Sequence, residues 1–477
     1  MIYIVQHERE SMRCSMKKLK FLLRTASLCM AFILMGTNTV SAKTPKVKKI
    51  KFSNVSSKKT MYRGTSKKFT VKITPSKAKS RKLQWYSSNK KVATVSSKGT
   101  VTAKKNGTAY ITARVKSQKS KKVRCKVTVK TKKVSKVSFN SSKVVLQQGK
   151  YYTRKPSVSP SYAYNKKVTY KSSNTKVATV NSSGKIYAKG QGTATITATA
   201  ADGSKKKASY PVRVIGKINN SSADFVAHRG LSAEAPENTV KAFELAGNAG
   251  FWGAETDIRR TKDGHFIAMH DATLKRMCGV DKRPEDLDYD YIRGLTIKSG
   301  NNISKYKNDK SATRVASLKE YLHTCKKSGM VPVIEIKMEY TTSRKAAKSN
   351  NEMQNMINED MKKLDVQVEE VMGEDQYMYI AFDLETVVQM NKVIKAATKP
   401  NVTLQHITEQ PSTSNINYYN NRELGLDCYY KNISNSNLEK FMDAGVPVNV
   451  WTVDDEEKVW DYITKKVDYI TTNKKFW

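Results

Sequence analysis

The residues best suited to chemistry are three carboxylates in the C-terminal half of the chain. Glu255 and Asp257 stand two positions apart in one short apolar run, and Glu335 stands in another. Side chains two residues apart on a strand share one face, so Glu255 and Asp257 are expected to point the same way. Acids are seldom buried without partners, and oxygen ligands favour a hard cation such as Mg²⁺ or Ca²⁺. A salt-bridge network with Lys337 and Arg229 is the alternative to a bound cation.

Two histidines accompany these acids. His228 ends an earlier apolar run, and His270 follows an Asp263-Gly264 turn that folds the chain back toward the acidic run. Imidazole changes charge near neutral pH, so two histidines beside one reacting group suit a general base and a general acid. Arg229 and Lys337 add positive charge of the kind that binds phosphate. The pattern therefore predicts acid–base chemistry on a phosphate-containing substrate.

The site residues lie near the ends of strand-like runs that alternate with helical stretches. The runs are Phe225–His228, Trp252–Ile258, Val331–Met338, Tyr377–Asp383, Val402–Ile407, Leu424–Cys428, Pro447–Val453 and Val467–Thr471. Ser317 and Glu320 form a capping box before one of the helices. This alternation predicts an α/β fold over 223–477, a (β/α)₈ TIM barrel with its chemistry at the carboxyl ends of the strands. A doubly wound open sheet is the alternative, but no glycine-rich phosphate-binding sequence follows the first run.

The N-terminal 42 residues have the pattern of a signal peptide. Four basic residues between positions 17 and 24 precede an apolar run at 26–35, and Val40-Ser41-Ala42 offers small residues for cleavage. We therefore predict cleavage after Ala42 and a secreted or cell-surface protein, with an uncleaved membrane anchor as the alternative. The cysteines beyond this segment are too widely spaced for a zinc site and are not required to pair: Cys125, Cys278, Cys325 and Cys428.

The positive charge is concentrated between the signal segment and the predicted barrel. The 477 residues carry 87 Lys and Arg against 41 Asp and Glu, a formal net charge of +46. Residues 43–217 hold 46 basic side chains and one acidic residue, Asp202, whereas 218–477 are close to neutral. Such a field would attract a polyanion. An anionic cell-envelope polymer or membrane headgroup is the expected partner, and not nucleic acid, because no nucleic-acid-binding signature is present. A solvated spacer is the alternative.

The basic region consists of two copies of one module, at 44–130 and 133–215. Val92-Ala93-Thr94-Val95 recurs 85 positions later as Val177-Ala178-Thr179-Val180, and the glycines that follow recur at the same offset. Alternating apolar and polar residues with frequent turns predict an antiparallel β-sandwich for each copy. The copies resemble the bacterial immunoglobulin-like modules of group 2, known from surface adhesins. That resemblance implies a spacer or binding role without catalysis.

The C-terminal motifs occur in an order that resembles a known enzyme family. They are His228-Arg229-Gly230, Pro236-Glu237-Asn238-Thr239, Glu255-x-Asp257, Thr261-x-Asp263-Gly264, His270-Asp271, Glu335-x-Lys337 and Trp451-Thr452-Val453. Together they look like the glycerophosphodiester phosphodiesterase family, whose barrel is shared with phosphatidylinositol-specific phospholipase C. The resemblance spans 224–477. It implies metal-dependent hydrolysis of glycerophosphodiesters to an alcohol and glycerol 3-phosphate.

By the same resemblance, each site residue takes a role. The implied roles are acid–base catalysis for His228 and His270, metal binding for Glu255, Asp257 and Glu335, phosphate binding for Arg229 and Lys337, and a glycerol pocket wall for Trp451. Glu237 is a further candidate, although Pro-Glu-Asn-Thr is also a typical helix start with an acid in the first turn. Residues 272–316 match the family's small insertion over the barrel mouth.

The end of the chain departs from the family pattern at several positions. The family usually ends in Asp-Gly-Ile-x-Thr-Asp-x-Pro, and here Tyr469, Asn473 and Lys475 stand in place of the Gly, the second Asp and the Pro. Asp454 follows Trp451-Thr452-Val453, where the family favours Asn. These changes put the substrate preference in doubt more than the chemistry.

Two other functions remain open on this sequence. One is a surface adhesin whose barrel is a passive scaffold, and the other is a phospholipase D-like or cyclising lyase activity at the same site. The sequence identifies neither the alcohol leaving group, nor the metal, nor the oligomeric state. It also leaves open whether the substrate is a small diester, a lipid or a teichoic-type polymer.

Overall fold

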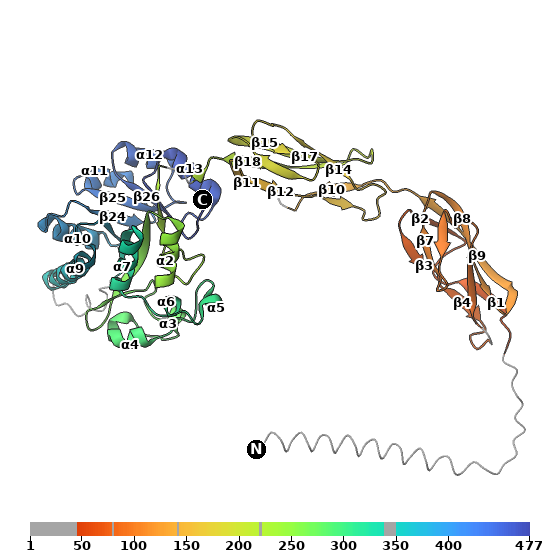
Figure 1. The fold of residues 1–477 in the computed structure, drawn as a ribbon, viewed down its shortest axis with the longest axis horizontal. Coiled ribbons are helices and arrows are strands. Elements are labelled where there is room, and N and C mark those ends of the chain that lie inside the picture. Colours follow the sequence, from red (N-terminus) through yellow and green to blue (C-terminus); the bar gives the residue numbers. More distant parts are fainter. Residues whose placement is uncertain (1–44, 79–80, 141–142, 219–221, 338–349) are drawn as a thin grey trace, which may run out of the picture. The chain divides into compact units, whose positions relative to one another are not determined.

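A computed structural model describes residues 45–78, 81–140, 143–218, 222–337 and 350–477 (Figure 1). The predicted signal segment, 1–42, lies outside the described residues. The chain divides into two compact units. One holds the first basic module with residues 159–166, and the other holds the rest of the second module with the barrel. In the described ranges no helix combines the length and the apolar character that a membrane crossing needs.

The first basic module is a sandwich of short strands around an apolar core. Its larger sheet contains β2 (Lys58–Tyr62), β9 (Gln118–Lys130), β8 (Gly107–Val115) and β5 (Leu83–Ser87); the others contain β3 (Ser66–Lys68), β7 (Thr100–Ala103) and β6 (Ala93–Val95), and β1 (Lys49–Phe52) with β4 (Val71–Thr74). Alternate residues of β8, such as Ala109 and Ile111, are fully buried. The period of two that predicted strands is therefore the period at which side chains enter the core.

The second module repeats this arrangement. Its sheets contain β11 (Val144–Gln147), β18 (Lys207–Ile215), β17 (Gly192–Ala200) and β14 (Val168–Ser172); β12 (Tyr151–Thr153), β16 (Lys185–Ala188) and β15 (Ala178–Val180); and β10 (Lys136–Ser138) with β13 (Ser157–Ser159). The prediction of a wholly antiparallel sandwich is wrong at one pair in each module, because β2–β9 and β11–β18 pair in parallel. An early strand and the last strand of each module run in the same direction, so side by side they can pair only in parallel.

The C-terminal half forms a closed parallel barrel, as predicted. Its strands are β19 (Asp224–Ala227), β20 (Gly253–Arg260), β22 (Val331–Ile336), β23 (Tyr377–Ala381), β24 (Val402–Thr408), β25 (Leu424–Tyr429), β26 (Val448–Trp451) and β27 (Tyr469–Thr472). Each pairs in parallel with its neighbour, in the order β19-β27-β26-β25-β24-β23-β22-β20, and β19 also pairs with β20. That last pairing closes the barrel and excludes the open doubly wound sheet.

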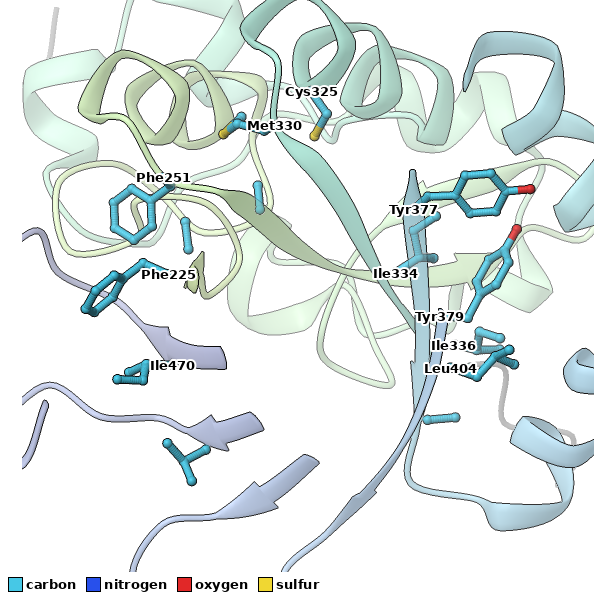
Figure 2. Close-up of a cluster of buried hydrophobic side chains, with 14 of the residues drawn as sticks. Phe225, Phe251, Cys325, Met330, Ile334, Ile336, Tyr377, Tyr379, Leu404 and Ile470 are labelled. Atoms are coloured by element: carbon cyan, nitrogen blue, oxygen red, sulfur yellow. The ribbon is translucent and has the colours of Figure 1, made fainter. Parts of the chain in front are cut away.

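Helices surround the barrel and bury its outer face. They are α2 (Val240–Ala249), α7 (Leu318–Ser328), α9 (Asn350–Met372), α10 (Leu384–Ala396), η3 (Thr413–Asn415), α11 (Ile416–Asn420), α12 (Asn435–Asp443) and α13 (Glu456–Lys465). The predicted capping box at Ser317 and Glu320 is present at the start of α7. Figure 2 shows outward-facing side chains of neighbouring strands, such as Ile334, Tyr377 and Leu404, in the cluster that these helices cover.

A small subdomain follows the hairpin that β20 makes with β21 (Phe266–Ala268). It contains α3 (Lys275–Cys278), η2 (Pro284–Asp286), α4 (Tyr289–Gly294), α5 (Ile303–Tyr306) and α6 (Lys310–Thr313). Met277, Ile292 and Val315 give it a separate apolar core, which also includes Ile267 of β21. The predicted insertion at 272–316 therefore packs on the hairpin that delivers His270.

Within the second unit, the second module contacts the barrel helix α13. Arg213 forms ion pairs with Glu457 and Asp461, and the second of these measures 2.7 Å. Ile215 and Ile218 belong to the same buried cluster as the outer face of the barrel. These contacts mean that a chain cut just before the barrel would expose part of its core.

Candidate active site

Three carboxylates meet at the mouth of the barrel, as the sequence predicted. Glu255 and Asp257 project from β20 into the barrel, and Asp257 lies opposite Glu335 in the register of β20 and β22. Their exposed fractions are 3%, 0% and 8%. One oxygen atom from each lies within 4.8 Å of the other two. Glu255 Oε1 and Asp257 Oδ1 are buried and make no hydrogen bond within the described residues.

The predicted ion-pair network is present around the same acids. Lys337 Nζ lies 2.7 Å from Glu335 Oε1 and 3.5 Å from Asp257 Oδ1, and Arg229 Nε lies 3.3 Å from Asp257 Oδ2. Although burial opposes ionisation of Asp257, Arg229 and Lys337 help to lower its pKa to about 2. The ion-pair network and the candidate cation site therefore involve the same carboxylates.

The lysine and arginine do not fully offset the repulsion among the three carboxylates. Burial raises the pKa of Glu255 well above its ordinary value, with repulsion from Asp257 adding to the effect. Burial and the same neighbour raise the pKa of Glu335 to about 7. A cation between these oxygens would relieve the repulsion and satisfy the two oxygens that make no hydrogen bond. The donor set therefore fits a hard divalent cation.

His228 lies at the carboxyl end of β19, beside β27. Its backbone N–H donates to Thr472 O at 2.9 Å, and its ring Nδ1 lies 2.8 Å from Asn473 Oδ1. Burial and the neighbouring Arg229 guanidinium lower the pKa of His228 to about 4. The ring is therefore neutral at pH 7 and able to accept a proton.

His270 reaches the same cavity from the β20–β21 hairpin, as predicted. The backbone N–H of Met269 donates to Asp257 O at 2.8 Å, which places the next residue beside the acids. His270 Nδ1 lies 3.0 Å from Asp271 Oδ1. Arg276 of α3 donates to both Asp271 oxygens, at 2.6 and 2.9 Å, so the insertion helps to fix the ring.

Glu237 stands outside the cavity wall and links two arginines. Its Oε1 accepts from Arg229 Nη1 at 2.9 Å and from Arg276 Nη2 at 2.7 Å. The predicted helix start at Glu237 is wrong, because Thr239 caps α2 and accepts from Ala242 N. Glu237 is thus an ion-pair partner that lies ahead of the helix, and it orients Arg229.

The site residues surround one cavity of about 200 Å³. Its lining includes the predicted residues His228, Arg229, Glu255, His270, Glu335, Lys337 and Trp451. Ile380, Ile407 and Phe382 add apolar surface to the lining, and Trp451 packs edge-on against Phe382 at 5.7 Å between ring centroids. The cavity thus presents both charged and apolar side chains.

Asp427 is the cavity residue that the sequence reasoning missed. It projects from β25 into the cavity, is 2% exposed, and its Oδ1 makes no hydrogen bond within the described residues. Burial raises its pKa well above the ordinary value, with repulsion from Glu335 next in size and an opposing hydrogen bond from Asn449. An acid in the middle of the apolar run 424–428 was the available signal, the same one that marked Glu255.

Other candidate residues have structural surroundings. His406 of β24 binds Tyr419 Oη through Nδ1 at 2.7 Å, and His323 is exposed on α7. The four cysteines left open by the sequence are buried free thiols: Cys125, Cys278, Cys325 and Cys428.

Comparison with known proteins agrees with this geometry. The profile of the glycerophosphoryl diester phosphodiesterase family matches 228–474, and that of the bacterial Ig-like domain (group 2) matches 47–127 and 133–209. Glycerophosphodiester phosphodiesterase 1 of Mus musculus is 33% identical over 112 residues, which are 24% of this chain and 33% of the mouse protein. A glycerophosphodiester phosphodiesterase of Bacillus altitudinis is 24% identical over 255 residues, which are 52% of this chain and 93% of that protein. The chain thus spans a third of the mouse relative and nearly all of the bacterial one.

Solved structures include an Oleispira antarctica phosphodiesterase in complex with the product sn-glycerol 3-phosphate. It is 19% identical, with a TM-score of 0.44, and the match covers 52% of this chain and 92% of that one. The family profile alone covers more than half of the 477 residues. With the family's ordered motifs assembled at one barrel mouth, this chain belongs to the glycerophosphoryl diester phosphodiesterase family.

Proposed function

We propose that the barrel hydrolyses glycerophosphodiesters to an alcohol and glycerol 3-phosphate. The observation that carries the proposal is the buried carboxylate cluster, two of whose members, Glu255 and Glu335, line one cavity together with both histidines. Membership of the family supports this substrate class. A passive scaffold has no need of buried acids that lack hydrogen-bond partners, so the adhesin alternative explains less.

The two histidines take different parts in the proposed reaction. His228 is neutral and lies beside the Arg229 guanidinium, which disfavours a second positive charge on the ring. His270 enters the cavity from the hairpin, and its Nδ1 lies 3.0 Å from Asp271 Oδ1. We therefore assign His228 as the general base, which leaves His270, the second histidine of the cavity, as the general acid.

Bond making and breaking follow from these assignments. The oxygen of a water molecule attacks phosphorus and gives its proton to His228. The bond between phosphorus and the leaving alcohol oxygen breaks, and His270 supplies the proton that this oxygen needs. Arg229 and Lys337 stabilise the charge that develops on the phosphoryl oxygens.

A divalent cation would be held by Glu255, Asp257 and Glu335. When bound, it would supply Lewis-acid stabilisation of phosphoryl charge. Mg²⁺ and Ca²⁺ both suit an all-oxygen donor set. Adding each metal separately to chelator-treated protein and measuring the rate shows which of the two supports more activity.

The proposal is tested by incubating the full chain with glycerophosphocholine, with and without a divalent cation. Choline and glycerol 3-phosphate are expected in equal amounts. Phosphocholine with glycerol would show cleavage at the other ester bond. A glycerol cyclic phosphate would favour the cyclising lyase.

The position of Asp427 indicates how the non-phosphate part of the substrate is recognised. The cavity wall that includes Ile380, Ile407 and Phe382 suits the CH groups of a polyol, and Asp427 Oδ1 is placed to accept from one of its hydroxyls. Sites built to bind a hydroxyl discriminate strongly against analogues that lack it. We therefore propose a substrate with a free hydroxyl near the phosphate.

Replacement of Asp427 by leucine is expected to remove this discrimination. The wild-type kcat/KM for glycerophosphocholine should exceed that for propyl phosphocholine by about 10²-fold or more, and Asp427→Leu should bring the ratio below about 10. Cys428→Ala, on the outer face of the same strand, is the matched control and should keep the wild-type ratio. An unchanged ratio in Asp427→Leu would remove Asp427 from substrate recognition.

The basic modules have a separate proposed role. We propose that the protein is exported and that the modules hold it on an anionic cell-envelope polymer, which would raise the local concentration of phosphodiesters. The signal-like segment and the 46 basic residues of 43–217 support this proposal. Because the second module packs on α13, the test uses the full chain and not an isolated barrel.

Binding to isolated envelopes is expected to weaken with salt. The Debye length falls from about 10 Å at 0.1 M salt to about 3 Å at 1 M, so co-sedimentation should be lost at the higher concentration. Replacing the exposed Lys48, Lys49, Lys51 and Lys72 by glutamine should lower the salt concentration at which half of the protein is released. If binding did not depend on salt, or if this variant bound as well as the wild type, the modules would act only as a spacer.

A further inference from the structure

Two of the departures from the family pattern, Asp454 and Asn473, meet each other in the structure. Asp454 follows β26 and Asn473 follows β27, so both lie at the carboxyl ends of neighbouring barrel strands. Asn473 Nδ2 donates to Asp454 Oδ2 at 2.6 Å, and its backbone N–H donates to Asp454 Oδ1 at 2.8 Å. Thr472 Oγ1 donates to Asp454 Oδ1 at 3.0 Å. The sequence shows these as two separate changes, whereas the structure joins them as one pair.

This pair fixes which atom faces His228. A carboxylate can only accept hydrogen bonds, so the Asn473 amide must turn its nitrogen toward Asp454. Its oxygen then faces His228 Nδ1 at 2.8 Å and accepts from Ser232 Oγ at 2.7 Å. His228 Nδ1 therefore carries the proton, and the lone pair of the neutral ring is on Nε2.

We propose that Asp454 and Asn473 are positioning residues that hold His228 in the Nδ1–H tautomer, with Nε2 available as the base. This inference rests on the proposed role of His228 in diester hydrolysis. Asp454 acts through Asn473 and does not touch the ring. An amide oxygen thus occupies the place beside His228 where the family's Asp would stand, and the carboxylate stands one side chain further away.

The structure predicts opposite behaviour for single and double exchanges of the pair. In Asp454→Asn, the new side chain has one acceptor oxygen where the carboxylate had two. That single oxygen cannot accept both from the backbone N–H of 473 and from the Asn473 side-chain amide. The backbone N–H cannot turn, so the Asn473 side chain would turn instead and present its nitrogen to His228. The ring would then shift to the Nε2–H tautomer, which cannot act as a base through Nε2.

In Asn473→Asp, two carboxylates would lie at the 2.6 Å contact and repel each other. The double variant Asp454→Asn/Asn473→Asp restores one acceptor and one donor across the pair. Asp at 473 then accepts both from the amide at 454 and from His228 Nδ1–H. We expect each single variant to lose about 10²-fold or more in kcat, as for a misplaced base, and the double variant to recover most of that loss.

The double variant also changes the charge beside His228. The charged groups that act on the ring are Arg229, Asp257 and Glu237. A carboxylate at 473 would join them and favour the imidazolium, so the pKa of His228 rises. The acidic limb of kcat/KM against pH should therefore move to higher pH, by about one unit or more.

The experiment compares the full-length wild type, the two single variants and the double variant. Kinetics on glycerophosphocholine are combined with ¹⁵N NMR of the histidine rings, in which His228→Ala identifies the signals of His228. Asp443→Asn, on the exposed end of α12, is the control for a lost carboxylate and should match the wild type. The inference is supported if Asp454→Asn shows the Nε2–H tautomer and the double variant regains activity with a shifted acidic limb.

Two results would overturn the inference. One is an Nδ1–H tautomer of His228 in Asp454→Asn, and the other is a double variant no more active than the single ones. The ring tautomer is measured without turnover. A wild type that cleaves no diester would therefore count against the proposed function, while the NMR result would still decide the role of the pair.

Discussion

His228→Ala is expected to lower kcat on glycerophosphocholine by about 10²–10⁴-fold, the usual contribution of a general base. Burial beside Arg229 keeps the ring neutral, and Asn473 leaves Nε2 as its proton acceptor. Methyl in place of imidazole removes this proton acceptor from the cavity. The measurement is kcat and KM at neutral pH with saturating divalent cation.

Two controls make the loss specific to the chemistry. His323→Ala, on the exposed face of α7, should retain the wild-type kcat. His270→Ala should lose a similar factor for the ordinary substrate, but less for a diester whose leaving group is a nitrophenol, because such a group needs no proton. If His228→Ala also regained activity with the nitrophenyl diester, the base and acid assignments would have to be exchanged.

Glu335→Gln is expected to abolish most of the activity by weakening cation binding. Glu335 supplies one of the three convergent oxygens, and an amide in its place removes a negative charge from the donor set. Isothermal titration with Mg²⁺ and Ca²⁺ should show weaker binding than in the wild type, and activity should return in part at high cation concentration. Chelation of the wild type should have the same effect on rate and be reversed by added metal.

Two results would contradict the assignment of the carboxylates as metal ligands. Full activity of the wild type in excess chelator would leave the cluster as an ion-pair network of Lys337 and Arg229 with no metal. A Glu335→Gln variant that binds the cation as tightly as the wild type would remove Glu335 from the ligand set. Glu409→Gln, a cavity-lining acid outside the cluster, is the matched control and should bind cation normally.

The barrel and its acids could be predicted because their signals are local. A strand has a side-chain period of two, so Glu255 and Asp257 reveal their common face without any knowledge of the neighbouring strand. The Asp263-Gly264 turn likewise fixes where His270 returns, and the register of β20 with β21 confirms it. The start of α2 could not be placed as well, because Pro-Glu-Asn-Thr resembles a helix start, whereas Thr239 at its end provides the cap and the helix begins after it.

The remaining parts of the site depend on which strands lie side by side. Asp454 and Asn473 are 19 positions apart and look like unrelated changes until β26 and β27 pair. Asp427 is an acid in an apolar run without a motif around it, and only the closed barrel turns it toward the cavity. The parallel β2–β9 and β11–β18 pairs were missed for the same reason, since alternation predicts a strand but not the direction of its neighbour.

Hydrolysis in H₂¹⁸O tests the central claim most directly. The full chain is supplied with glycerophosphocholine and Mg²⁺ or Ca²⁺ in labelled water. The products are then separated, and their masses are measured by mass spectrometry. Attack of water on phosphorus with choline as the leaving group places one ¹⁸O in the phosphoryl group of glycerol 3-phosphate and none in choline. Labelled choline, labelled phosphocholine, or an unlabelled cyclic phosphate as the final product would contradict the account.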